Sequence, residues 1–409
     1  MKKRLLLLKF LILPANLALF NTTVSSMEMT LKEKIIEDIT KNSDRYDIKK
    51  ILESTTDESR GNIILKLAIK VLGPLQIRPL REISGHKNWV ELLKITNEGK
   101  IFSLSIEGEG IFHNYDGKIF KKFETKNKIY GQCCALDDSK IIMATLKGDV
   151  FICNFDGDLL HSYNDHHDPV YSLFCDPNDG KIFSGSYDNT VTIRSKKGTK
   201  LIGRLQQEYS VYSICLLSDK SIVTGNTGGN IIIFDKNGQR THYWKAHDDR
   251  IRFLYATTDD LILSGSEDYT VKVWNKNGVF LKCLGGHTDC IWNICEIKNN
   301  SRIIVSASGD RTLRLWDRSG MCLAELNGHK DYVLSLCIDE SNNIISSGRD
   351  AIIIIWDLRF FSKLSSLNYV QAMAIWEILK EESLIKRTSN YEKKLVWDKI
   401  NKAMDNYKI

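Results

Sequence analysis

Histidine, serine and aspartate recur along this sequence in the same order and at nearly the same spacing. Histidine can act as a base toward a serine nucleophile while an aspartate orients it, so each set carries the groups needed for hydrolysis. A catalytic centre needs one such set, whereas copies at a regular spacing indicate a repeated structural unit. The three sets are His247, Ser264 and Asp268; His287, Ser306 and Asp310; and His329, Ser346 and Asp350.

Other signatures of enzymes and metal sites are missing from the sequence. It has no G-x-S-x-G nucleophile elbow, no Walker phosphate loop and no C-x-x-C pair. His166, His167 and Asp168 have the types of metal ligands, but His166 already occupies a repeat position. We therefore predict no catalytic residue, no metal site and no cofactor.

The repeat has a period of 40 to 42 residues and is marked by the end of a recurring apolar strand. The residues at this position are His113, Cys153, Arg194, Phe234, Trp274, Trp316 and Trp356. A glycine follows four residues after each of the first six, in strings such as Asn275–Gly278 (NKNG). Such strings are typical of hairpin turns, because glycine adopts positive φ without strain. Short strands bounded by such turns predict seven units of four antiparallel strands.

The two ends of the repeated region complement each other. The seventh unit has Phe360 in place of the turn glycine, so we expect the chain to leave after the third strand of that unit, near Asp357. A segment like a fourth strand instead precedes the first unit: Pro79–His86 (PLREISGH) matches Leu281–His287 (LKCLGGH). Pairing this segment with the last unit would close a ring and leave no open edge between its ends.

Residues 77–359 resemble the WD-repeat (WD40) family. The resemblance rests on Gly-His and Trp-Asp pairs, such as Gly286-His287 with Trp316-Asp317. It implies an all-β fold, a seven-bladed β-propeller; the closing N-terminal strand and the helical flanking segments are predicted from the patterns of this chain itself. It also implies a structural hydrogen-bonded set in each blade, formed by His, Ser, Asp and a Trp of the third strand. The complete sets are His247, Ser264, Asp268 and Trp274; His287, Ser306, Asp310 and Trp316; and His329, Ser346, Asp350 and Trp356.

The other four blades depart from this pattern. The third keeps His166, Ser184 and Asp188 but has Arg194 at the Trp position, and the first has His86, Ser103, Glu107 and His113. The second and fourth depart most, with Thr125, Lys147 and Cys153, and with Gln207, Gly228 and Phe234. We expect these changes to affect local rigidity and not the fold.

The first strand of most units has apolar residues at offsets zero, three and often five. The change of parity predicts a β-bulge, which would turn the residue at offset one toward the loop-bearing face of the propeller. These residues and those just before the strand are rich in Tyr, Trp and Arg, as binding hot spots are. For any one of them, packing between blades is the alternative. The predicted partner-binding residues are Trp89, Glu91, Tyr130, Tyr171, Tyr212, Arg250, Arg252, Trp292 and Tyr332.

All ten cysteines lie between positions 133 and 337, and four of them share one repeat position. These four are Cys133, Cys215, Cys295 and Cys337. Equivalent positions of different blades are poorly placed for disulfides, so we predict free, buried thiols. Free thiols favour a reducing compartment.

The segments outside the repeats have their own patterns. Residues 1–26 begin with Lys2, Lys3 and Arg4, continue with the apolar run Phe10–Phe20 and end with small polar residues. This order predicts a secretory signal peptide and export to the periplasm, the medium or the secretory lumen. The alternatives are an uncleaved membrane anchor, a buried helix and, given the cysteines, a cytoplasmic chain. Residues 27–76 and 360–409 have helical patterns, such as the apolar stripe of Tyr369–Leu379.

The amino-acid composition gives little information about function. The chain is 43% hydrophobic and 26% charged, and its net charge of +6 is spread along the sequence, so we expect no nucleic-acid partner. We predict a non-enzymatic scaffold that binds a protein or peptide through one loop-bearing face. One alternative is the substrate-recognition adaptor of a ubiquitin-ligase-type complex, tethered through Met29–Leu72. The other is an enzyme with its site in the central channel.

Overall fold

In the computed structural model the described residues are 48–54, 57–72, 74–77, 79–96, 98–125, 134–137, 140–297 and 303–358, with short pieces at 372–375, 378–379, 396–400, 402 and 404. The chain forms two compact units. One is Ile77–Asp357, and the other combines Met1–Gln76 with Leu358–Ile409. The expected signal segment 1–26, Tyr130 and Cys133 lie outside the described residues.

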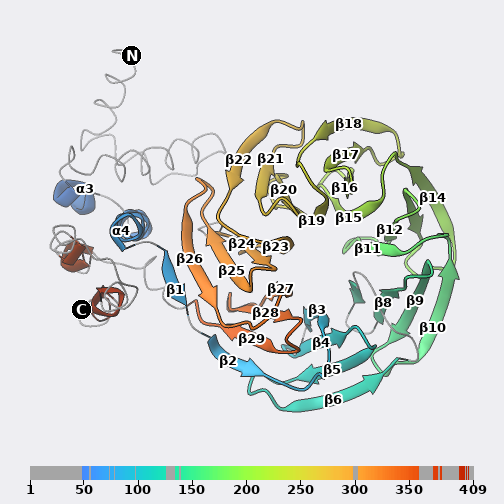
Figure 1. Ribbon diagram of the computed structural model, residues 1–409, viewed down its shortest axis with the longest axis horizontal. Helices are drawn as coiled ribbons and strands as arrows, with labels where there is room; N and C mark the ends of the chain where they lie inside the picture. Colours follow the sequence, from blue (N-terminus) through green and yellow to red (C-terminus); the bar gives the residue numbers. More distant parts are fainter. Residues whose placement is uncertain are drawn as a thin grey trace. The chain divides into compact units, whose positions relative to one another are not determined.

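The unit Ile77–Asp357 is a β-propeller, with seven antiparallel sheets arranged as blades around a ring (Figure 1). In blades 1 to 6 the four repeat strands lie side by side in chain order, with the first strand nearest the centre. The predicted seven-bladed fold is therefore confirmed. The period of about 40 residues produces it, because each unit is just long enough for four short strands and their turns.

The strands of blades 1 and 2 are β3 (Val90–Ile95), β4 (Ile101–Ser105), β5 (Glu109–His113), β6 (Ile119–Glu124), β7 (Cys134–Asp137), β8 (Lys140–Ala144), β9 (Asp149–Asn154) and β10 (Leu159–Asn164). Those of blades 3 and 4 are β11 (Val170–Cys175), β12 (Ile182–Ser186), β13 (Thr190–Arg194), β14 (Leu201–Gln206), β15 (Val211–Leu216), β16 (Ile222–Asn226), β17 (Asn230–Phe234) and β18 (Arg240–Lys245). Those of blades 5 and 6 are β19 (Ile251–Ala256), β20 (Ile262–Ser266), β21 (Val271–Trp274), β22 (Phe280–Leu284), β23 (Ile291–Ile297), β24 (Ile303–Ser308), β25 (Thr312–Trp316) and β26 (Cys322–Asn327). Blade 7 contains β27 (Val333–Ile338), β28 (Ile344–Gly348), β29 (Ile353–Trp356) and β2 (Pro79–Ile83).

Blade 7 is completed by the N-terminal strand, as the sequence predicted. Strand β2 pairs with β29 in antiparallel register, with Arg81 opposite Ile355 and Ile83 opposite Ile353. Blade 7 then packs on blade 1, where Ile83, Ile345 and Ile353 share a core with Val90 and Ile101 of β3 and β4. The N-terminal strand is thus joined to the last blade by backbone hydrogen bonds, and the last blade is joined to the first by apolar packing.

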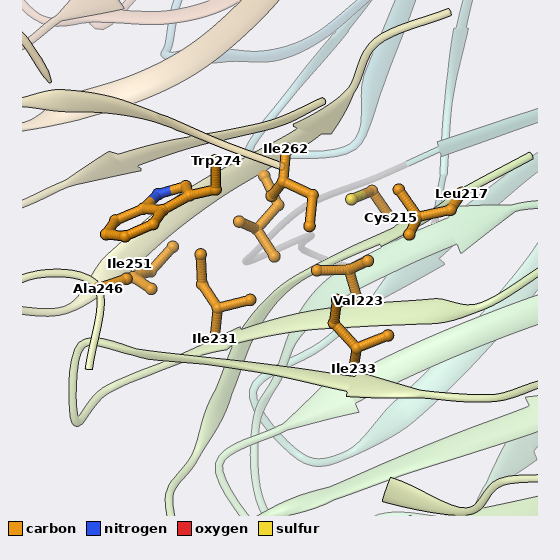
Figure 2. Packing of buried hydrophobic residues seen from close by; sticks show 10 residues of the cluster. Cys215, Leu217, Val223, Ile231, Ile233, Ala246, Ile251, Ile262 and Trp274 are labelled. Carbon is orange, nitrogen blue, oxygen red and sulfur yellow. The ribbon is translucent and has the colours of Figure 1, made fainter. Parts of the chain in front are cut away.

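The core of the propeller lies between neighbouring blades. Figure 2 shows one such cluster, in which Val223 and Ile231 of blade 4 face Ile251, Ile262 and Trp274 of blade 5. Strand residues that point to one side of a blade therefore meet those from the next blade. This arrangement explains why the second strands are apolar on both faces, since every residue of β4, β12, β16 and β20 is buried.

The described parts of the flanking segments are helical, as the sequence predicted. Helix α3 spans Ile48–Ser54, helix α4 spans Asp57–Leu72, and a short strand, β1 (Leu75–Ile77), follows. Near the C-terminus Val396, Ile400 and Met404 are helical and buried, so the apolar stripe with spacings of four residues faces a core. None of the helices within the described residues is both long and apolar enough to cross a bilayer.

The closing strand offers a direct test of ring stability. Ile83→Ala should lower the free energy of unfolding by about 2–5 kcal/mol, because this side chain is 2% exposed in the core between blades 7 and 1. Leu80→Ala in the same strand is the control, since Leu80 is 54% exposed and should change stability by less than about 0.5 kcal/mol. Urea denaturation followed by circular dichroism measures both. Equal losses in the two variants would contradict the closure.

Candidate functional site

A β-bulge interrupts the first strand of six blades at the same place. In β11 and β12, Val170 pairs with Ser186 and Ser172 with Gly185, so Tyr171 is the extra residue. The same shift occurs in β3, β15, β19, β23 and β27. The bulged residues are Glu91, Tyr171, Tyr212, Arg252, Trp292 and Leu334. This extra residue explains why the buried apolar residues of the first strands lie at offsets zero and three and do not alternate strictly.

All six bulged residues line a central cavity of about 430 Å³. Its wall is formed by the residues at offset three, which are Leu93, Leu173, Ile214, Leu254, Ile294 and Leu336. The residues at offset three are thus all apolar, while the bulges add two tyrosines, a tryptophan, an arginine and a glutamate to the lining. Such a combination is typical of binding sites.

The bulged side chains also contact one another around the cavity. The rings of Tyr171 and Tyr212 are stacked, with 4.4 Å between centroids. The guanidinium of Arg252 lies between aromatic rings, 4.9 Å from the centroid of Tyr212 and 4.8 Å from that of Trp292. Arg252 Nε also donates a hydrogen bond of 2.5 Å to Glu267 Oε1. Blades 3 to 6 therefore present a continuous row of aromatic and cationic groups.

Arg349 extends this row across blade 7 to blade 1. Its guanidinium lies 5.6 Å from the ring centroid of Trp292, 4.4 Å from that of Tyr332 and 4.2 Å from that of Trp89. These distances are within the range of cation–π attraction. We call the connected set the channel-mouth ring; it comprises Trp89, Tyr171, Tyr212, Arg252, Trp292, Tyr332 and Arg349.

The structure brings most of the predicted binding residues together, with three exceptions. Glu91 lines the cavity but does not stack with the ring. Arg250 is exposed, and it acts on the phenol of Tyr212 through its charge. Tyr130 lies outside the described residues.

Sequence reasoning missed three residues, Tyr187, Glu267 and Arg349. Each precedes the turn residue of a hydrogen-bonded set, Asp188, Asp268 or Asp350, and so occupies another repeat position. In the structure the backbone N–H of Arg349 donates to Tyr332 O at 2.9 Å, and that of Glu267 donates to Arg250 O at 3.0 Å. These bonds place the turn beside the start of the first strand. The residue just before the turn aspartate varies between blades, and this variation could have identified the position as a candidate for partner binding.

The charge of Glu91 is sensitive to its surroundings. Burial raises the pKa of Glu91 to about 7, and the nearby charge of Arg349 acts in the opposite direction without cancelling the effect. A carboxyl group at the cavity wall therefore changes charge near neutral pH.

The three complete His–Ser–Asp–Trp sets are each assembled inside one blade. In blade 5, His247 Nδ1 lies 2.8 Å from Asp268 Oδ2 and His247 Nε2 lies 2.7 Å from Ser264 Oγ. Trp274 Nε1 donates to the same serine oxygen at 2.9 Å. Blades 6 and 7 repeat these contacts at 2.7 to 2.9 Å. Both nitrogens of each histidine thus have partners within their own blade.

The blades that depart from the His–Ser–Asp–Trp pattern form comparable contacts with other residue types. In blade 1, His86 Nδ1 pairs with Glu109 at 2.8 Å, so Glu109 takes the place that the sequence assigned to Glu107. In blade 4, Gln207 Nε2 replaces the histidine and donates to Thr224 Oγ1 at 2.9 Å. In blade 3, Arg194 binds Asp165 at 2.6 Å and lies 4.1 Å from the ring centroid of Tyr163.

Burial controls the titration of both the histidines and the cysteines. It lowers the pKa of His166 and His247, against the opposing effect of their aspartate partners. It also raises the pKa of Cys215 and Cys337 to about 12, so these free thiols stay protonated at neutral pH. Within the described residues, no group of three or more His, Cys, Asp or Glu side chains is arranged to hold a metal ion.

Comparisons with known proteins agree with this architecture. A family model described as "WD domain, G-beta repeat" matches residues 157–195, 238–275, 278–317 and 320–357. Each match begins at a turn glycine, so it covers the last strand of one blade and the first three of the next. The computationally designed Ika8 protein has a similar fold, with a TM-score of 0.57, 20% identity and coverage of 69% of this chain and 100% of that chain.

One curated relative also matches part of the chain. The F-box/WD repeat-containing protein sel-10 of Caenorhabditis elegans is 26% identical over 136 residues, which are 31% of this chain and 23% of that protein. The match therefore spans about a quarter of the length of this relative.

The buried histidines predict that stability falls as the pH falls below neutral. The unfolded chain takes up protons near pH 6.5, whereas the lowered pKa of His247 keeps it neutral in the fold. The free energy of unfolding should therefore decrease between pH 7.5 and 5.5. His247→Gln, which imitates Gln207 of blade 4, should reduce this decrease by about 1 kcal/mol while costing about 1–3 kcal/mol at pH 7.5.

Urea denaturation at the two pH values measures the effect. His167→Gln is the matched control, because His167 is exposed and its replacement should leave the pH dependence unchanged. If both variants had the same pH dependence as the unsubstituted chain, burial of His247 would not be its cause.

Proposed function

Because this chain is a WD-repeat β-propeller, we propose that it is a non-enzymatic scaffold that binds a protein or peptide partner through the channel-mouth ring. WD-repeat propellers in general mediate protein–protein interactions, and the proposal assigns this role to one surface. The partner would contact the end of the propeller where the first strands begin.

The observation that carries the proposal is the clustering of aromatic and arginine side chains at one end of the cavity. Tyr, Trp and Arg are the residues that contribute most to protein interfaces, because they bury a large area with few rotatable bonds. Tyr171, Arg252 and Trp292 are only partly buried, so each keeps surface available to a partner. Backbone pairing on both sides of each bulge holds these side chains in place, which limits the entropy lost on binding.

The position of the histidines supports a binding function over catalysis. Each complete set is used within its own blade, and each serine oxygen already lies within hydrogen-bond distance of a histidine and a tryptophan. The bulged residues that line the cavity are instead Tyr171, Tyr212, Arg252, Trp292, Glu91 and Leu334.

Affinity capture with the full-length chain tests the proposal. A Tyr171→Ala, Tyr212→Ala, Trp292→Ala triple variant should lose the proteins that the unsubstituted chain recovers from the extract of its own cells, as measured by quantitative mass spectrometry. The control removes three exposed rings from the outer strands: Phe120→Ala, Tyr243→Ala and Phe280→Ala. It should recover the same proteins as the unsubstituted chain.

Two checks separate binding from folding. Thermal unfolding should be cooperative in each variant, and the single variant Tyr171→Ala, which alters the packing less, should weaken the same interactions. Recovery of the same partners by the triple variant would exclude the channel-mouth ring as their binding site.

The similarity to an F-box/WD repeat-containing protein favours a second candidate function. In this case the propeller would recognise a substrate for a ubiquitin-ligase-type complex, and the helical segment with α3 and α4 would contact the ligase. The adaptor function predicts that a cullin is recovered equally by the unsubstituted chain and the triple variant, while the substrate is lost from the variant. Absence of a cullin from both captures would exclude this function and leave the scaffold function intact.

A further inference from the structure

Arg349 is held more tightly than a surface arginine normally is. Three aromatic rings surround its guanidinium, from Trp292 of blade 6, Tyr332 of blade 7 and Trp89 of blade 1. Each ring restricts the rotamers of the long side chain and replaces part of its water shell. The guanidinium is therefore positioned before any ligand arrives.

Arg349 also has no salt-bridge partner among the described residues, unlike comparable arginines. Arg252 is paired with Glu267, Arg194 with Asp165, and Arg318 with Asp259 and Glu296. Within the part of the chain that the structure describes, Arg349 forms no salt bridge and no side-chain hydrogen bond, and its Nε is buried. Nε1 of the neighbouring Trp292 is likewise buried without an acceptor. Buried donors without acceptors are costly, so this part of the ring has an unmet demand for hydrogen-bond acceptors.

We infer that the channel-mouth ring recognises its partner through a carboxylate, which an Asp or Glu side chain of the bound peptide presents to the guanidinium of Arg349. The inference rests on the proposed function, and it specifies the chemistry of the partner. A carboxylate matches the planar guanidinium and can accept two parallel hydrogen bonds. The surrounding rings exclude water and strengthen such a pair.

The charges around the ring fit one carboxylate and disfavour a polyanion. Glu91 and Glu267 lie on the same face of the propeller. Asp289 lies beside Tyr332 and raises the pKa of its phenol. These negative groups would repel a nucleic-acid backbone, whereas a peptide with a single acidic residue can avoid them. The partner is therefore a peptide segment that presents a single Asp or Glu side chain.

A peptide array tests the carboxylate directly. Fluorescently labelled full-length protein is applied to paired peptides without histidine, identical except for Glu or Gln at the central position. Binding to the preferred Glu peptides should exceed binding to their Gln partners by about tenfold, the effect of one charge-assisted hydrogen-bonded pair. Arg349→Ala should abolish the difference. Arg311→Ala is the matched control, because Arg311 is exposed on the equivalent turn of blade 6 and should keep it.

The outcomes separate this inference from the proposed function. If no peptide depends on its Glu, or if Arg349→Ala keeps the preference, the carboxylate is excluded, while loss of captured partners by the triple variant would still support the scaffold. If Glu-dependent peptides bind the triple variant as tightly as the unsubstituted chain, the channel-mouth ring is not the site and both proposals fail.

Discussion

The two ends of the propeller sequence meet in one sheet, where Pro79–Ile83 pairs with Ile353–Trp356. Each of the other blades buries its faces only against its neighbours, so a blade at an open end would expose an apolar face to water. Closure gives every blade two neighbours. The contacts of Ile83 and Ile353 with Val90 therefore stabilise the whole ring and not blade 7 alone.

The hydrogen-bonded sets act at a smaller scale, since each stabilises the connections of one blade. His247 joins the loop before the first strand to Ser264 on the second strand and to Asp268 in the following turn. Blade 4 shows that the connection matters more than the residue type, because Gln207 and Thr224 make an equivalent bond. The departing blades keep the fold since neighbouring blades hold their strands in place by apolar packing.

Most of the fold could be predicted because its determinants are local and repeated. The blade boundaries follow from the turn glycines, the Trp positions and the apolar offsets. Each bulge follows from a change in the alternation of apolar residues within six positions. Two features could not be predicted. Glu107 and Glu109 are both acidic and two residues apart, so only the turn conformation selects Glu109. Arg349 and Trp89 are far apart in sequence, and their contact exists only because the ring closes.

A propeller with identical blades would present the same group seven times around its cavity. Here the same bulge presents Glu91 in blade 1, tyrosines in blades 3 and 4, Arg252 in blade 5 and Trp292 in blade 6. The backbone that positions these side chains is shared, so exchange of one residue changes the chemistry of the surface with little effect on the fold. Specificity for a partner must therefore come from the positions where the blades differ, and the most distinct of these is Arg349, whose guanidinium lies among rings of blades 6, 7 and 1.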